Sequence, residues 1–136
     1  MNGLARRQEY TRPPQSGGLR KKAILLVEPD LDLRLLLNML LTEDGCVVEA
    51  CGSLIEALVA ISEKHFDLVI TQGTPGIDGL LLLHVLKEMG SVTPSVVISA
   101  SHEREPYLLA MSLGALDYFI TPLDYAALQR VIHSRT

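Results

Sequence analysis

The chain has 136 residues, of which 48% are hydrophobic and 21% are charged, and its net charge at pH 7 is −4. This length suits one domain with a full core, and no apolar run approaches the roughly 20 residues of a membrane span. Residues 1–22 carry six basic side chains against Glu9, a net charge of +5, which leaves −9 on residues 23–136. The charge argues against a nucleic-acid surface on that larger part, and the composition against membrane insertion.

Residues 1–22 are predicted to form a disordered, basic leader. They contain Pro13-Pro14 and Gly17-Gly18 and too few apolar residues to fold. No apolar block follows the charges, so the leader lacks the pattern of a secretory signal, and we expect a cytoplasmic protein. A solvated tail and a weak arm for an anionic partner are the two interpretations of its charge.

Short apolar runs rich in Val and Ile alternate with longer segments of helical period from Ala23 onward. This alternation predicts an α/β domain over residues 23–136, with a parallel sheet covered by helices on both faces. The predicted strands are 23–27, 47–50, 67–71, 95–100 and 117–120. The predicted helices are 30–43, a second that opens at Ser53, 79–89, a fourth with Pro106 in its first turn, and a fifth from Asp124 to the C-terminus.

Local signals support these boundaries. Gly45 and Gly114 are predicted to end the first and fourth helices, and Ser53 with Glu56 has the spacing of a capping box. Cys46 and Cys51 lie five residues apart and flank the predicted strand 47–50, so a strand period of two directs them to opposite faces. We therefore expect two inert thiols and neither a disulfide nor a metal site.

In an open parallel sheet, ligands bind beyond the carboxyl ends of the strands. The residues that follow the predicted strands there are 28–30, 72–74, 99–101 and 121–122. They include neither the Gly-x-Gly-x-x-Gly of a dinucleotide site nor the Gly-Lys-Ser/Thr of a P-loop. A flavodoxin-like cofactor-binding or enzymatic domain is therefore the weaker alternative, and we expect no enzyme.

Several segments resemble, in order and spacing, a bacterial two-component response-regulator receiver domain. They are residues 24–30 followed by Arg34, then 67–70, 75–79, 94–100 and 114–122. The resemblance covers about residues 23–135. It implies a flavodoxin-like (βα)5 doubly wound parallel sheet with the strand order 2-1-3-4-5.

The resemblance also implies a phosphorylation pocket. In that family an acidic pair after the first strand holds Mg²⁺, an Asp after the third accepts a phosphoryl group, a Ser or Thr after the fourth binds the phosphate, and a Lys follows the fifth. Here Glu28 and Pro29 occupy the two positions of the acidic pair, so only the first is acidic. Gln72 occupies the acceptor position, and Thr121 replaces the Lys. Ser99 keeps the hydroxyl.

This pocket is expected to be degenerate. An amide is a poor nucleophile, and shifting the alignment by one residue offers Thr71, which also lacks a carboxylate. Asp30 matches the position after the acidic pair, so Glu28 and Asp30 are the residual candidates for a metal that prefers several oxygen ligands. We expect no metal and no cofactor; Mg²⁺ belongs to the alternative, a conventional phosphoacceptor with an atypical site.

Two positions match the family's conformational switch, the hydroxyl of Ser99 and the aromatic ring of Tyr118. These two residues either still couple two conformations of the domain or simply pack and form hydrogen bonds.

The first predicted helix offers a candidate partner surface. Matching it to the family directs these residues to the core: Leu33, Leu36, Leu37, Leu40 and Leu41. Leu31, Leu35 and Met39, spaced i, i+4 and i+8, then form one stripe where polar residues are more usual. The stripe either binds a partner helix or folds onto neighbouring apolar surface. The fourth helix, fifth strand and fifth helix form the alternative surface, suited to a homodimer.

We therefore expect a stand-alone pseudo-receiver of two-component (phosphorelay) signal transduction, because the chain ends with the fifth predicted helix. It would work by phosphorylation-independent protein–protein interaction. The expected partner is a histidine kinase, a phosphotransfer domain or another receiver.

Overall fold

The computed structural model describes residues 21–73 and 78–135, which form alternating strands and helices. The strands are β1 (Ala23–Val27), β2 (Val47–Cys51), β3 (Leu68–Gln72), β4 (Ser95–Ser99) and β5 (Asp117–Ile120). The helices are α1 (Leu31–Glu43), α2 (Leu54–Glu63), α3 (Asp78–Glu88), α4 (Arg104–Ser112) and α5 (Tyr125–Arg135). The predicted alternation is confirmed. The predicted leader, except for Lys21 and Lys22, lies outside the described residues. So do residues 75–77 of the predicted family segment 75–79, together with residue 74.

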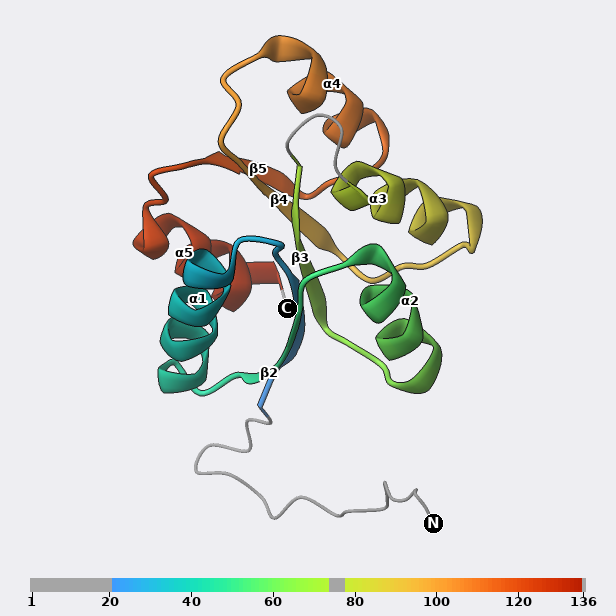
Figure 1. Ribbon diagram of the computed structural model, residues 1–136. Coiled ribbons are helices and arrows are strands. Elements are labelled where there is room, and N and C mark those ends of the chain that lie inside the picture. The colour runs from blue at the N-terminus through green and yellow to red at the C-terminus, as the bar shows by residue number, and fades with distance from the viewer. Residues whose placement is uncertain (1–20, 74–77, 136) are drawn as a thin grey trace.

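All strand pairs are parallel, in the order β2-β1-β3-β4-β5. Helices α1 and α5 cover one face of the sheet, and α2, α3 and α4 cover the other (Figure 1). This is the flavodoxin-like arrangement expected from the resemblance. The strand order reverses between β1 and β3, so the crevice of the fold is expected where these two strands end.

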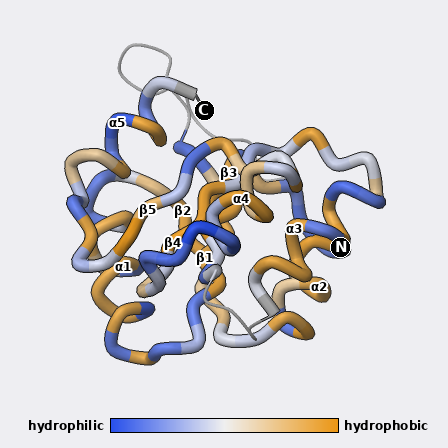
Figure 2. Tube along the Cα trace, turned by 90° about the horizontal axis from the view of Figure 1, so that it is seen from above, coloured by the Kyte–Doolittle hydropathy of each residue, from blue (hydrophilic) through white to orange (hydrophobic). Residues whose placement is uncertain are grey.

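Alternate residues of β1 face different layers of the molecule. Ile24 and Leu26 belong to the core cluster under α1 and α5, whereas Leu25 and Val27 belong to the cluster under α2 and α3. The strand period of two produces this division, and burial on both faces explains why the strand is continuously apolar. Figure 2 shows the hydrophobic strands in the middle of the molecule, between the two helical layers.

The predicted helix signals have structural counterparts. The Ser53 side-chain oxygen accepts the N–H of Glu56 at 3.2 Å, and the Glu56 carboxylate accepts the N–H of Gly52 at 2.9 Å. Gly45 and Gly114 have φ values of +94° and +95°, a conformation that favours glycine, and α1 and α4 end just before them. Within the described residues, no helix has the length and apolar character needed to cross a membrane.

The two cysteines are buried, unbonded thiols on opposite faces of the sheet. Cys46 packs in the cluster under α1 and α5, and Cys51 in the cluster under α2 and α3. The pKa of Cys51 is raised to about 11. Burial is the largest cause, and the negative charge of the nearby Glu56 carboxylate is the second. The thiol is therefore protonated at neutral pH, as expected for a structural cysteine.

One predicted core position in α1 is wrong. Leu37 and Leu41 are buried as expected, but Leu36 is 48% exposed. The five leucines assigned to the core span an arc of about 140° around a helix of 3.6 residues per turn, and Leu36 lies at one limit of that arc. The sheet contacts a narrower arc centred on Leu37, so Leu36 points away from it.

Candidate functional site

A small cavity lies at the carboxyl edge of the sheet, where β1, β3, β4 and β5 end. Its volume is about 160 Å³. The lining residues are Glu28, Asp30, Leu33, Gln72, Ile98, Ser99, Ala100 and Thr121. The structure thus brings together five of the predicted pocket residues, although they are separated by up to 93 positions in the chain. Pro29 is exposed and is not part of the lining.

Glu28 is the buried acidic group of this cavity and is only 5% exposed. Its N–H donates to the carbonyl oxygen of Cys51 at 2.9 Å, which fixes it beside the end of β2. Its carboxyl oxygen Oε2 accepts the N–H of Asp30 at 3.0 Å. Burial raises the pKa of the Glu28 carboxyl above its ordinary value, because desolvation disfavours the charged form.

Arg34 contacts this region in a way that the sequence did not predict. Its guanidinium donates to the carbonyl oxygen of Glu28 at 2.9 Å and lies against Gly52, where an added Cβ would contact Nη1. In the sequence, the one indication that Arg34 belongs to this region is that it follows residues 24–30 in the first segment that resembles the family. Arg34 also lowers the pKa of the Glu28 carboxyl, but less than burial raises it.

Asp30 caps the first helix. Its Oδ1 accepts the N–H of Asp32 at 3.1 Å, which satisfies one of the free donors in the first turn of α1. The side chain is exposed at the rim of the cavity. A local capping role therefore explains why a carboxylate occurs at this position.

Gln72, and not Thr71, reaches the cavity. Thr71 is fully buried and absent from the lining, whereas Gln72 ends β3 and lines the cavity. The start of α3 lies against the same strand end, since a Cβ at Gly79 would overlap the carbonyl oxygen of Gln72. Only glycine permits this close approach, which helps to hold the end of β3 in place.

Two hydroxyl residues complete the polar lining. The Ser99 side-chain oxygen accepts the N–H of Ser101 at 3.0 Å, and the N–H of Thr121 donates to the Ser99 carbonyl oxygen at 2.9 Å. The Thr121–Pro122 peptide bond is cis. Ser99 is buried and Thr121 is half-buried, so this wall offers neutral donors and acceptors and carries no charge.

Tyr118 lies apart from the cavity. Its ring packs with the cluster formed by β4, α3 and α4, and it meets the ring of Tyr107 edge to face at a centroid distance of 5.4 Å. Its buried hydroxyl has no hydrogen-bond partner among the described residues. Ser99 and Tyr118, the two predicted switch residues, therefore occupy different environments, and Tyr107 is a packing partner that the sequence analysis missed.

The cavity offers fewer carboxylates than the magnesium site implied by the family resemblance, which adds an acceptor aspartate to an acidic pair. Mg²⁺ prefers near-octahedral coordination by oxygen and usually takes carboxylate ligands. Among the described lining residues, Glu28 and Asp30 alone contribute carboxyl groups, and each accepts a backbone N–H. No group of three or more His, Cys, Asp or Glu side chains suited to a metal occurs in the described part of the chain.

Beside the cavity, α1 exposes apolar side chains. We define the α1 apolar patch as Leu31, Leu35, Leu36 and Met39. Leu35 is the most exposed of the four, at 58%. The predicted stripe is thus solvent-accessible and does not fold onto its neighbours, and Leu36 widens it.

The alternative surface is also apolar. We define the α4 apolar surface by its exposed residues: Tyr107, Leu108, Leu109, Met111 and the neighbouring Ile120 of β5. It lies on the other helical layer from α1 (Figure 1).

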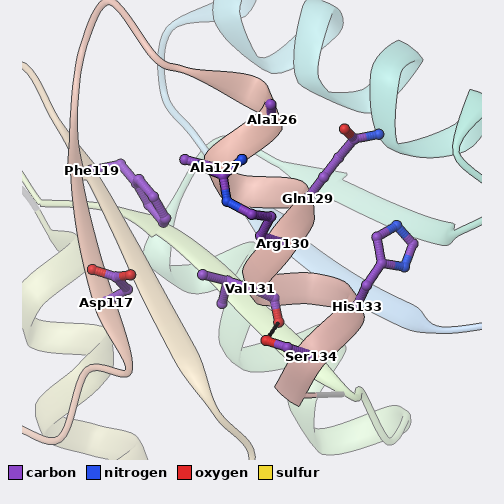
Figure 3. A pocket seen from close by; sticks show the side chains of 9 residues that line it. All are labelled: Asp117, Phe119, Ala126, Ala127, Gln129, Arg130, Val131, His133 and Ser134. Atoms are coloured by element: carbon purple, nitrogen blue, oxygen red, sulfur yellow. Dashed lines mark hydrogen bonds between the residues drawn. The ribbon is translucent and has the colours of Figure 1, made fainter.

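A broad, open hollow of about 860 Å³ lies between β5 and α5 (Figure 3). Phe119 and Asp117 line it from the strand, opposite Arg130 and Val131 of α5. His133 contributes to the same hollow, and its Nε2 lies 3.1 Å from Oδ2 of Asp44. The sequence analysis did not predict this hollow.

Comparison with known proteins identifies the family. The chain matches the response regulator receiver domain over residues 24–133. The two-component response regulator PhoP of Pseudomonas aeruginosa is 36% identical over 107 residues, which cover 78% of this chain and 48% of PhoP. The transcriptional regulatory protein ZraR of Escherichia coli strain K12 is 33% identical over 110 residues, which cover 80% of this chain and 25% of ZraR. The chain therefore spans half or less of these curated relatives.

Solved structures have the same fold. The signal receiver domain of an HD domain-containing protein from Pseudomonas fluorescens Pf-5 superposes with a TM-score of 0.79 at 22% identity, covering 85% of this chain and 94% of that one. NtrX from Brucella abortus gives a TM-score of 0.77 at 28% identity, covering 85% of this chain and 27% of NtrX. Together with the sequence match, this places the chain in the family of response regulator receiver domains, the signalling modules of two-component systems.

Proposed function

We propose that this receiver domain acts in two-component signalling by binding a protein partner, without forming an aspartyl phosphate. The lining of the carboxyl-edge cavity carries the proposal. The end of β3 contributes the Gln72 amide, and the carboxyl groups of Glu28 and Asp30 already accept backbone N–H groups. An amide does not supply the nucleophilic carboxylate that acyl phosphate chemistry needs.

The rest of the cavity supports the same proposal. In the family alignment Thr121 takes the position of a lysine, and this hydroxyl does not offset the charge of a phosphoryl group. Within the described part of the lining, Glu28 and Asp30 are the only residues with carboxyl groups. We propose that the domain works without Mg²⁺ or another cofactor and catalyses no reaction.

We propose the α1 apolar patch as the surface that binds the partner. Receiver domains interact with histidine kinases and phosphotransfer domains, and an apolar helix face suits docking against another helix. The charge of −9 on residues 23–136 argues against nucleic acid as the ligand of this domain. The α4 apolar surface is the corresponding candidate for binding a second receiver, and the proposed location is the cytoplasm.

Incubation with acetyl phosphate and Mg²⁺, followed by intact mass measurement, tests the chemistry. We expect no mass gain, whereas a conventional receiver treated in parallel gains a phosphoryl group. Gln72→Asp is the matched variant, because it restores a carboxylate at the end of β3. A phosphoryl group on the unaltered protein, or beryllofluoride-dependent chemical shifts around Gln72, would show conventional phosphoacceptor activity and overturn the proposal.

A charge placed on α1 tests the surface. Leu35→Glu should abolish capture of the native partner from the host, because a carboxylate in a desolvated apolar contact is unfavourable. Circular dichroism should remain unchanged, since Leu35 is exposed. Ile55→Glu is the control, as Ile55 is exposed on α2, in the other helical layer. Retained capture by a folded Leu35→Glu variant would exclude the patch.

A further inference from the structure

The α1 apolar patch begins beside the carboxyl-edge cavity, at the first residue of α1. Asp30 lines the cavity, and the next residue, Leu31, is the first residue of both α1 and the patch. Leu33 also lines the cavity, from a side of the helix about 200° away from Leu31. Leu35 lies one turn beyond Leu31. A helix packed over Leu31 and Leu35 therefore has side chains within reach of the cavity.

The charges that line this cavity have one sign. Glu28 and Asp30 are acidic, and the other lining residues that the structure describes are apolar or neutral. Arg34 directs its guanidinium to the main-chain oxygen of Glu28 and lies against Gly52, which is not a lining residue. Burying a carboxylate costs free energy unless an opposite charge or sufficient hydrogen bonds compensate it. The cavity is thus electrostatically suited to a cation.

The size and chemistry of the cavity suit a basic side chain. Its volume of about 160 Å³ exceeds the space needed for one water molecule. An ammonium group has three donors and a guanidinium group has five. The lining includes residues whose side chains carry carboxyl, amide or hydroxyl oxygens, which are suitable acceptors: Glu28, Asp30, Gln72, Ser99 and Thr121.

We propose that the partner of this domain is an amphipathic helix that packs on the α1 apolar patch and inserts one lysine or arginine into the carboxyl-edge cavity beside Glu28. This inference rests on the proposed function, because it specifies the partner of the same surface. The net charge of −9 on residues 23–136 favours the approach of a basic helix.

A displayed library of single-helix peptides provides the probe. Its surface positions vary among Leu, Lys, Arg, Glu and Gln, and binders are selected on the full chain. We expect the binders to share one basic position beside an apolar stripe. Replacing that basic residue by Gln should weaken binding to the unaltered protein on the order of tenfold, and should have little effect on binding to Glu28→Gln, as a direct coupling requires.

Two protein variants separate this inference from the proposed function. Peptides that need Leu35 but bind Glu28→Gln as tightly as the unaltered protein would overturn the basic insertion and leave the docking surface intact. Peptides that bind Leu35→Glu without loss would contradict the docking surface itself. Glu63→Gln is the charge control, because it removes the same charge from the exposed end of α2 and should leave affinity unchanged.

Two more measurements identify the occupant. The pKa of the Glu28 carboxyl, followed by NMR, should fall when a basic peptide binds, since a nearby cation favours the charged form. An unchanged pKa would place the basic residue elsewhere and overturn the insertion. Self-association of the full chain that Leu35→Glu abolishes would assign the patch to a second copy and overturn the helical partner proposed above.

Discussion

The carboxyl-edge cavity and the α1 apolar patch meet at Asp30 and Leu31 but are built in different ways. The cavity collects residues from four strand ends, and its polar groups are tied to the backbone, as Glu28 is to Asp30 and Ser99 is to Ser101. The patch belongs to one helix, and its side chains project into solvent. Substitutions in the cavity are therefore expected to alter both stability and partner binding. Substitutions in the patch are expected to alter partner binding without altering stability.

The two faces of α1 provide the test with the largest expected effect. Leu37 is 1% exposed and packs in the core, so Leu37→Ala should lower the free energy of unfolding by about 3 kcal/mol. Leu35→Ala, on the patch, should change it by less than about 0.5 kcal/mol. Urea denaturation measures both. Equal losses would contradict the assignment of a core face and a binding face.

The close approach of α3 to the end of β3 gives a smaller effect. Gly79→Ala should lower the free energy of unfolding by about 2 kcal/mol, because the new Cβ overlaps the carbonyl oxygen of Gln72. Gly52→Ala is the matched control, since its Cβ overlaps only the flexible end of Arg34 and makes an ordinary contact with the carbonyl oxygen of Glu28. A loss for Gly52→Ala as large as that for Gly79→Ala would show that the cavity wall is not specially constrained.

Glu28→Gln should produce the smallest effect, a change in pH dependence. Burial raises the pKa of Glu28 above 4.5 in the folded state, so the folded state binds this proton more tightly than the unfolded state. The contribution of the protonated Glu28 carboxyl to the free energy of unfolding is complete below pH 4.5. It is lost as the pH rises through the folded-state pKa. Glu28→Gln should remove that fall and unfold at higher urea concentration than the unaltered protein near pH 7. An unchanged difference between the two proteins from pH 4 to pH 7 would contradict the raised pKa.

Much of the cavity could be predicted because its residues directly follow strands. Glu28, Gln72 and Ser99 stand at or just after strand ends, and parallel strands bring their carboxyl ends to one edge. Tyr118 was matched only to a switch position, with residual coupling and simple packing both left open. A family match assigns a position but not a side-chain direction, and the packing of β5 against α4 places this ring in another cluster.

Local periodicity in the sequence was sufficient to predict the strands, the helices and the capping of α2 by Ser53, because each depends on residues only a few positions apart. The exposure of Leu36, the contact of Arg34 with Glu28 beside Gly52, and the hollow between β5 and α5 emerged only in the tertiary structure. These features depend on how closely one element approaches another, and distances of that kind are set by the packing of the whole domain and leave no repeat in the sequence.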